Sequence, residues 1–431
     1  MLFADISIIN EDFEYLEHQW VGTQGARIAY VGGEAPEDPA AFGETYDGAG
    51  RLLMPGFYNA HAHAPMTILR GYGEGMPLQE WLNDRIWPFE AKMTADDNYW
   101  GTALACAEML RYGIVGFSDM YYHSARRFQA VAEAGMKMNS CEGLIAFEPK
   151  PYREYPIYEI EEELIREFHG AEDGRLQVDY NIHAEYTSNP VTVADIAQIA
   201  KEKGLRIHLH ASETRMETEE CKQRHDGMTP IQYFDSLGVF DNPTTAAHCV
   251  WLEDDDYAIL REKGVFVAAN PVSNMKLGSG FAPYRRMFEE GLNVALGTDG
   301  CSSNNNHDIM QDMFVFALSA CGSTLDPTAV KPAQVLRAAT RTGALSQGRE
   351  DCGLLKVGFR ADLCVLDITG PSWSPMTDGA ANVVYAGHGS DVVLTMVDGS
   401  VRYRDGKWTG IDVERAMFEC DAAVKRIVSE L

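Results

Sequence analysis

The stretch Met54-Pro55-Gly56-Phe57-Tyr58-Asn59-Ala60-His61-Ala62-His63 decides how the rest of the chain is interpreted. A strand-like run over residues 51–58 leads into a His-x-His pair, and residues two apart on an extended chain point to the same side. Paired imidazoles suit a borderline ion such as zinc, which needs further nitrogen or oxygen ligands. An isolated pair is more often two surface histidines in a loop, so the metal interpretation depends on partners at the ends of other strands.

The composition argues against several classes of partner. The 431 residues include 36 Lys and Arg against 64 Asp and Glu, which gives a formal net charge of −28. Such a surface repels phosphate backbones and anionic lipid, so we expect neither nucleic-acid nor membrane partners. No apolar run approaches the roughly 20 residues that cross a bilayer, and no leader-like segment begins the sequence, so we expect a cytoplasmic protein. The nine cysteines form no Cys-x-x-Cys motif, which predicts free, buried thiols.

Both ends of the chain have the alternating pattern of antiparallel strands. Short alternating stretches, separated by turn-rich segments, occur at residues 5–10, 26–33, 361–367 and 392–403. The step Asp398-Gly399 between two apolar runs indicates a hairpin. We therefore predict a small β-sandwich domain built from residues 1–55 and 356–431, with a helix over residues 413–431.

The middle of the chain, residues 56–355, alternates short apolar runs with longer amphipathic stretches, which is the βα pattern of a parallel sheet. We predict strands at residues 52–60, 114–120, 137–145, 176–183, 206–210, 244–250, 265–269 and 294–298. We predict helices between them at residues 99–112, 125–134, 160–167, 193–203 and 257–263. Eight βα units indicate an α/β fold with a (β/α)8 TIM barrel, whose chemistry lies at the C-terminal ends of its strands.

Polar side chains follow four of these predicted strands. They are His61 and His63 after the first, His208, His210 and Glu213 after the fifth, His248 after the sixth and Asp299 after the eighth. A single such histidine is more often a packed or surface residue, but candidates on four strand ends indicate one site on one rim of the barrel. An Asp before Gly is often only a turn former, and the position of Asp299 after the last strand favours a catalytic role.

These motifs resemble the amidohydrolase superfamily, in the mononuclear branch that includes S-adenosylhomocysteine and methylthioadenosine deaminases. The matching features, which extend over essentially the whole chain, are residues 55–63, 210–213, His248 and residues 270–276, 298–300 and 353–363. The resemblance implies a hydrolytic deaminase that converts adenosine or a 5′-modified adenosine to the inosine analogue and ammonia. The 5′-modified candidates are 5′-deoxyadenosine, methylthioadenosine and S-adenosylhomocysteine.

The resemblance also implies that His61, His63, His210 and Asp299 hold one divalent ion, with zinc (Zn2+) expected and iron, manganese or nickel as alternatives. His208 is an alternative to His210 as the metal ligand, because both side chains point to the same face of the strand. The His-x-x-Glu spacing of the family starts at His210, however, which favours His210. We therefore interpret His208 as a satisfied barrel residue. The fourth strand lacks the lysine that bridges two ions in binuclear relatives, so we expect a single ion.

The proton transfers are assigned by the same resemblance. Glu213 would carry a proton to the ring nitrogen beside the attacked carbon and later help to deliver one to the leaving amine. His248 would orient the water and stabilise the developing charge, while Asp299 would also accept the proton of the water. The alternative for Glu213 is a solvated carboxylate at the start of a helix.

Two residues are candidates for substrate contact. Glu90 follows Trp81 at a spacing that, in nucleoside-deaminating relatives, places the glutamate on the ribose hydroxyls; its alternative is an acid on a surface helix. His183, at the end of the fourth strand, either contacts the substrate or packs at the barrel mouth. Those relatives use arginines after the third strand to hold the amino-acid carboxylate of the substrate. In this sequence no arginine within residues 147–155 aligns with them, which favours a substrate with a smaller 5′ group.

Two other functions are considered. The same fold could serve an aminohydrolase or chlorohydrolase that acts on guanine, a pterin or a triazine, and an enzyme for free bases would not need Glu90. A non-catalytic barrel that acts as a binding module would be expected to lose at least one of the site residues, and all of them are present. We expect a small-molecule substrate, and a homo-oligomer is a fair expectation for an enzyme of this size.

Overall fold

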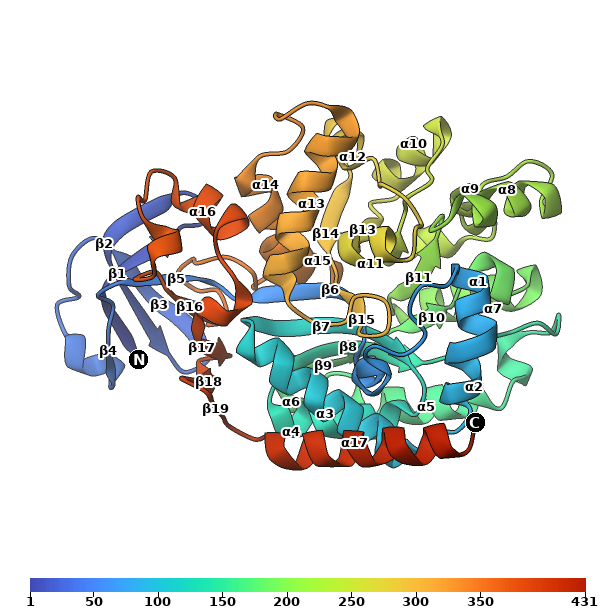
Figure 1. Ribbon diagram of the computed structural model, residues 1–431, viewed down its shortest axis with the longest axis horizontal. Coiled ribbons are helices and arrows are strands. Elements are labelled where there is room, and N and C mark those ends of the chain that lie inside the picture. The colour runs from blue at the N-terminus through green and yellow to red at the C-terminus, as the bar shows by residue number, and fades with distance from the viewer.

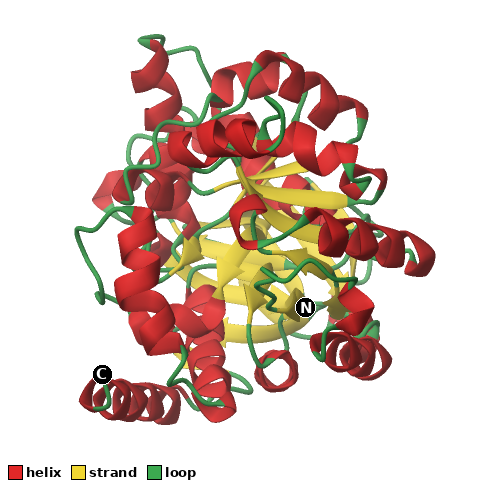
Figure 2. Ribbon diagram, turned by 90° about the vertical axis from the view of Figure 1, so that its right-hand side faces the viewer, coloured by secondary structure: helices red, strands yellow, loops and turns green.

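The computed structural model describes all 431 residues as a mixed α/β fold (Figure 1). Strands gather at the centre, and helices surround them (Figure 2). Among the helices, none combines the length and the apolar character that a membrane span requires. All nine cysteines are free and eight of them are buried, which confirms the prediction for the thiols.

The central strands are parallel and almost entirely buried. They are β6 (Phe57–His63), β7 (Ile114–Tyr121), β8 (Lys137–Glu142), β9 (Leu176–Val178), β10 (Tyr180–Ile182), β11 (Ile207–Ala211), β12 (Thr244–His248), β13 (Phe266–Ala269), β14 (Asn293–Leu296) and β15 (Asp299–Gly300). They form two five-stranded sheets, ordered β15-β6-β7-β8-β9 and β10-β11-β12-β13-β14. Only Asp179 separates β9 from β10, and only residues 297–298 separate β14 from β15. The chain therefore passes directly from one sheet to the other at both edges.

Helices cover these strands on the outside. The connections between them carry α3 (Ala95–Arg111), α4 (Ser124–Ala134), α5 (Ile157–Phe168), α6 (Ala171–Gly174), α7 (Pro190–Lys203), α8 (Arg215–Arg224), α9 (Pro230–Ser236), α10 (Asp254–Glu262), α11 (Pro271–Lys276) and α12 (Tyr284–Glu289). After the last central strand follow α13 (Ile309–Thr324), α14 (Pro332–Arg337) and α15 (Gly343–Ser346), and the later helix α16 (Gly379–Tyr385) packs on α13 and α14. The five helices predicted from the sequence are confirmed, with small shifts of their ends. Local chemistry sets these ends: the Asn189 side chain accepts a hydrogen bond from the Thr192 N–H at the start of α7, and Gly204 ends that helix in the left-handed region.

The first predicted strand, residues 52–60, is wrong as a single element. The structure divides it at Gly56 into β5 (Arg51–Pro55), which pairs with strands of the chain ends, and β6 of the central sheets. A side chain at Gly56 would collide with Val115, so the chain changes sheets where it has no side chain. An uninterrupted apolar run predicts that the segment is buried, but it does not reveal that one part of the segment belongs to one sheet and the rest to another.

Both ends of the chain meet in one nine-stranded sheet. Its remaining strands are β1 (Leu2–Ile9), β2 (Tyr15–Gln24), β3 (Arg27–Gly32), β4 (Thr45–Asp47), β16 (Leu363–Asp367), β17 (Val392–Val397), β18 (Ser400–Arg404) and β19 (Lys407–Trp408). The order is β19-β18-β17-β16-β5-β1-β2-β3, with β4 beside β1. The hairpin predicted at Asp398-Gly399 is confirmed between β17 and β18.

A buried ion pair ties this terminal sheet to the central strands. The Lys137 ammonium, at the start of β8, donates to the carboxylates of Asp362 and Asp398, the latter over 2.7 Å. The Tyr58 hydroxyl also donates to Asp362. Burial opposes ionisation of Asp362, but the charge and hydrogen bond of Lys137 hold the pKa of its carboxyl below the usual value. The two sheets thus share a charged junction whose Lys137 and Asp362 side chains are buried.

The last helix, α17 (Val413–Ser429), leaves the terminal sheet and packs along α3 (Figure 1). Its apolar face includes Ala423 and Ile427, which belong to the same buried cluster as Ile86 and Phe89. These two residues lie in the segment formed by α1 (Leu78–Trp81), the π-turn Leu82–Ile86 and α2 (Trp87–Glu90). The C-terminal helix therefore supports the segment that carries Glu90.

Candidate active site

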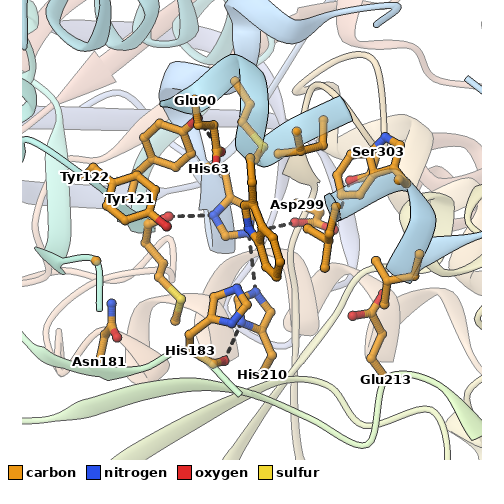
Figure 3. Close-up of a pocket in the computed structure, with 18 of the residues that line it drawn as sticks. His63, Glu90, Tyr121, Tyr122, Asn181, His183, His210, Glu213, Asp299 and Ser303 are labelled. Atoms are coloured by element: carbon orange, nitrogen blue, oxygen red, sulfur yellow. Dashed lines mark hydrogen bonds and ion pairs between the residues drawn. The ribbon is translucent and has the colours of Figure 1, made fainter. Parts of the chain in front are cut away.

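The ends of β6 and β11 and the start of β15 bring the four predicted ligands into contact. The Nε2 atom of His63 lies 3.4 Å from Nε2 of His210 and 3.2 Å from Oδ1 of Asp299. The Nε2 atom of His61 lies 3.4 Å from the same Oδ1. Figure 3 shows His63, His210 and Asp299 directed at one another within the pocket. The four predicted ligands therefore face a common point.

Backbone carbonyls fix the orientation of two of these rings. Nδ1 of His63 lies 2.6 Å from the Met120 carbonyl oxygen, and Nδ1 of His210 lies 2.7 Å from that of His183. Because a carbonyl oxygen only accepts hydrogen bonds, each Nδ1 carries a hydrogen atom, and each Nε2 is turned toward the common point. This is the arrangement of metal-ligating histidines in proteins.

His208 lies behind the cluster. Its Nε2 atom is 2.9 Å from Nδ1 of His61, and both rings are buried. Burial, reinforced by the neighbouring His61, lowers the pKa of His208 well below its ordinary value, so its ring is neutral and can accept the Nδ1–H of His61. This geometry makes His208 the partner of His61 and favours His210 as the ligand.

The chemistry of the donor set fits a divalent cation. Nε2 of His61 is fully buried and has no hydrogen-bond partner, and burial lowers the pKa of this imidazole to about 4. Burial opposes ionisation of Asp299 as well, but the neighbouring imidazoles of His61 and His63 hold the pKa of its carboxyl well below the usual value. A neutral imidazole nitrogen and an ionised carboxylate, buried together, are donors that zinc and similar ions prefer.

Two serines hold the carboxylate of Asp299. The hydroxyls of Ser273 and Ser303 donate to its Oδ2 over 2.6 and 3.0 Å, which leaves Oδ1 turned to the histidines. Asp299 has a φ of 63°, in the left-handed region that a non-glycine residue rarely adopts. The sequence prediction missed both serines, although Ser273 lies inside the quoted motif at residues 270–276.

Glu213 is a buried carboxyl beside the cluster, which contradicts the alternative of a solvated helix-start residue. Its side chain is 8% exposed, and its Oε2 lies 3.8 Å from Nε2 of His248. Burial raises the pKa of Glu213, so this group retains its proton to a higher pH than an exposed glutamate. Ser279 donates to its Oε1 over 3.1 Å, a contact that the sequence did not reveal.

His248 is held on its opposite side by Asn274. The His248 Nδ1 lies 2.8 Å from the Asn274 Oδ1, so Nδ1 carries the hydrogen atom and Nε2 faces the cluster. Like Asp299, His248 has a left-handed φ, here 73°. Two predicted catalytic residues therefore share a strained backbone conformation, which is a common property of functional sites.

Glu90 and His183 both line the same pocket. The Tyr121 hydroxyl donates to Oε1 of Glu90 over 2.6 Å, and burial raises the pKa of this carboxyl to about 7. The alternative of an exposed surface-helix acid is therefore wrong. Burial lowers the pKa of His183 to about 4, and its Nδ1 lies 2.8 Å from the Thr187 hydroxyl. Figure 3 places Glu90 and Tyr121 on one side of the histidines and Glu213 on the other.

Comparisons with known proteins agree with one another. Residues 52–402 match the model of the amidohydrolase family. The chain is 40% identical over 385 residues to a protein of Methanosarcina mazei named 5′-deoxyadenosine deaminase, covering 89% of this chain and 88% of the relative. It is also 40% identical over 413 residues to a protein of Pelotomaculum thermopropionicum named 5-methylthioadenosine/S-adenosylhomocysteine deaminase, covering 95% and 94%. Among solved structures, an adenosine deaminase of Xanthomonas campestris with bound zinc superposes with a TM-score of 0.91 and 28% identity, over 99% of this chain and 98% of that one.

Proposed function

The chain belongs to the amidohydrolase family, and from this premise we propose that it is a metal-dependent hydrolytic deaminase of adenosine or 5′-modified adenosines. It is a hydrolase acting on the C–N bond of a cyclic amidine, which it converts to the inosine analogue with release of ammonia. The observation that carries this proposal is the joint position of the imidazole–carboxylate cluster, Glu213 and Glu90 in one pocket. The names of its relatives support the same reaction.

His61, His63, His210 and Asp299 would hold one divalent ion. The short distances among their Nε2 and Oδ1 atoms, and the unpartnered Nε2 of His61, support this assignment. Zinc suits the nitrogen and oxygen donors, and iron, manganese or nickel could replace it according to availability. When bound, the ion supplies a hydroxide at neutral pH by lowering the pKa of a water molecule.

Residues of the chain would carry the protons. Glu213, which burial keeps protonated to a higher pH, would donate to the ring nitrogen beside the attacked carbon. Asp299 would accept a proton from the attacking water, and Glu213 would help to pass a proton to the amino group, which leaves as ammonia. His248 would orient the attacking water and stabilise the charge that develops as it adds to the ring, because its Nε2 faces both the cluster and Glu213.

Glu90 would accept hydrogen bonds from the ribose hydroxyls, and His183 would contact the substrate through its neutral ring. The buried position of Glu90 supports this role, since a carboxyl inside a pocket needs polar partners. A ribose-binding group also favours nucleosides over guanine, pterins or triazines as substrates. The substrate is in each case a small molecule.

We also propose how the sheets are organised into domains. The two central sheets would close into one (β/α)8 barrel over residues 56–355, because the chain passes from one to the other at both edges. Residues 1–55 and 356–431 would form the separate β-sandwich domain with its C-terminal helix. Cytoplasmic location and a homo-oligomeric state stay predictions.

A panel of possible substrates tests the proposed function. Ammonia release and the change in ultraviolet absorbance would be measured with adenosine, 5′-deoxyadenosine, methylthioadenosine, adenine and guanine. We expect turnover of the nucleosides and little of the bases, with a raised KM for nucleosides in Glu90→Gln. Turnover of guanine with none of any nucleoside would contradict the proposal and would favour the free-base alternative.

A further inference from the structure

The pocket around the candidate active site contains no cationic lysine or arginine. Of its 22 lining residues 12 are hydrophobic, and the only members of the Asp, Glu, Lys and Arg types are Glu90, Glu213 and Asp299. Away from the ion proposed at the histidines, the lining therefore supplies no positive charge, and an anionic substituent there would lose its hydration and gain no cationic partner.

The position of Glu90 shows which part of this pocket would receive the 5′ substituent. A substrate whose attacked carbon lies at the histidines and whose ribose reaches Glu90 must place its 5′ group beside the neighbours of Glu90. The Tyr121 hydroxyl donates to Glu90, and the ring of the next residue, Tyr122, lies so close to Gly143 that a Cβ added there would be 3.0 Å from it. Leu144 follows in the lining of the pocket.

Asn181 completes this arm of the pocket, which we define as Tyr122, Gly143, Leu144 and Asn181. Its Nδ2 donates to the Glu142 carbonyl oxygen over 3.2 Å, and this contact identifies the other amide atom as Oδ1. That Oδ1 is buried without a partner. In Figure 3, Asn181 lies on the same side of the histidines as Tyr121 and Tyr122, opposite Glu213. The side-chain polar groups of the arm are therefore the Asn181 amide, whose Oδ1 is a neutral acceptor, and the Tyr122 hydroxyl, and neither supplies the positive charge that a carboxylate needs.

The cations that follow β8 in the sequence are engaged elsewhere. Lys150 pairs with Glu148 over 2.8 Å. Arg153 pairs with Asp195 over 3.1 Å and with Glu202 over 2.8 Å. Neither cation lines the pocket. Each already has a carboxylate partner, so neither is free to neutralise a substrate.

We propose that the enzyme selects adenosines with an uncharged 5′ substituent, such as hydrogen, hydroxyl or alkylthio, and discriminates against a 5′ amino-acid substituent. This inference rests on the proposed deaminase function and narrows its substrate class. Leu144 is the specificity-determining residue, because it occupies the arm where a cation would be needed to bind a carboxylate.

The test separates the charge of the 5′ group from its size. kcat/KM would be measured for methylthioadenosine, for 5′-butylthioadenosine, which has a long neutral chain, and for S-adenosylhomocysteine. We expect the butylthio compound within about tenfold of methylthioadenosine and S-adenosylhomocysteine lower than the butylthio compound by about 100-fold. Equal values for the two long substrates would overturn the inference, whether both are good or both are poor.

A matched pair of variants tests the assignment to Leu144. Leu144→Arg introduces a cation into the arm, whereas Phe147→Arg introduces one in the same loop at a side chain that is 67% exposed and lines no part of the pocket. We expect Leu144→Arg to raise the ratio of kcat/KM for S-adenosylhomocysteine to that for 5′-butylthioadenosine by about tenfold, and Phe147→Arg to leave it unchanged.

An unchanged ratio in a folded Leu144→Arg that still deaminates the butylthio compound would contradict this role of the arm. Should that variant fail to fold, the three substrates with the wild-type enzyme still decide the inference. Absence of turnover with methylthioadenosine itself would instead refute the deaminase function, together with the inference that rests on it. The two failures are therefore distinguishable.

Discussion

The Ser279 hydroxyl donates a hydrogen bond to Oε1 of Glu213 over 3.1 Å. The backbone of Ser279 is held in turn by Trp251, whose indole N–H donates to the Ser279 carbonyl oxygen over 2.7 Å. A neutral hydroxyl therefore helps to orient the carboxyl that we assign to proton transfer. Burial raises the pKa of Glu213 although His248 and this hydrogen bond oppose the shift, so the carboxyl holds its proton to a higher pH than an exposed glutamate.

Substitution of Ser279 by alanine should change the pH profile. The hydrogen bond from Ser279 stabilises the ionised carboxylate and lowers the pKa of Glu213, so its loss should move that pKa upward. We expect kcat to fall by about tenfold with little change in KM, and the Glu213 transition in the kcat profile to move to higher pH. Ser279→Thr, which keeps the hydroxyl, should restore both. A lower kcat with an unmoved transition would argue against a positioning role.

Glu213→Gln should remove catalysis without removing the ion. General acid–base groups contribute about 100-fold to 10,000-fold to rate, so we expect a loss in kcat of that order. Elemental analysis should still find one divalent ion per chain, because Glu213 is outside the proposed ligand set. Glu219→Gln, at a side chain that is 53% exposed, is the matched control and should behave as wild type. Loss of the ion together with activity would assign Glu213 to the ligands instead.

Binding of the ribose should depend on pH through Glu90. Burial raises the pKa of this carboxyl to about 7. Its ionised form accepts two hydroxyl hydrogen bonds better than its protonated form, so KM for nucleosides should rise as the pH falls below about 7. The Tyr121 hydrogen bond lowers this pKa, and Tyr121→Phe should therefore move the rise in KM to higher pH. With 2′,3′-dideoxyadenosine, which lacks both hydroxyls, KM should show no such rise; the same rise there would contradict the assignment.

The junction between the sheets should be sensitive to loss of Lys137. Its side chain is 3% exposed, and that of Asp362 is fully buried. Lys137→Met leaves the buried carboxylate without its cation, which we expect to destabilise the protein by about 3–5 kcal/mol. The measurement is the shift in the urea unfolding midpoint. Lys356→Met, which breaks an exposed pair with Glu11, should cost less than about 1 kcal/mol. Equal shifts in the two variants would show that the junction contributes no special stability.

The parts of the site that lie on strand ends could be predicted from the sequence. His61, His63 and His210 end short apolar runs, and parallel strands bring such ends to one edge. Ser279 could not be predicted, because it lies in a loop 66 residues from Glu213 in the sequence. Ser303 lies only four residues from Asp299, but it follows no periodic pattern that would mark it as a partner. The spacing of residues in the sequence predicts which side chains lie on the same face of one strand or helix. It does not predict which loop residues come into contact once the chain is folded.

Some parts of the fold could likewise be predicted from the sequence, and others could not. The hydrophobic runs predicted the central strands and the helices between them, but not the change of sheet at Gly56, since burial looks alike in both sheets. The long strand β2 was also missed. Its first half is largely polar and exposed, so it lacks the alternation that marks a half-buried strand.

Ammonia release from methylthioadenosine is the most direct test of the proposed metal-dependent deaminase activity. It would be measured with the protein carrying one divalent ion, after removal of the ion by chelation, and after zinc is added back. We expect one ammonia per inosine analogue formed, loss of turnover on chelation and its return with zinc. No ammonia from methylthioadenosine, 5′-deoxyadenosine or adenosine by the metal-loaded protein would contradict it.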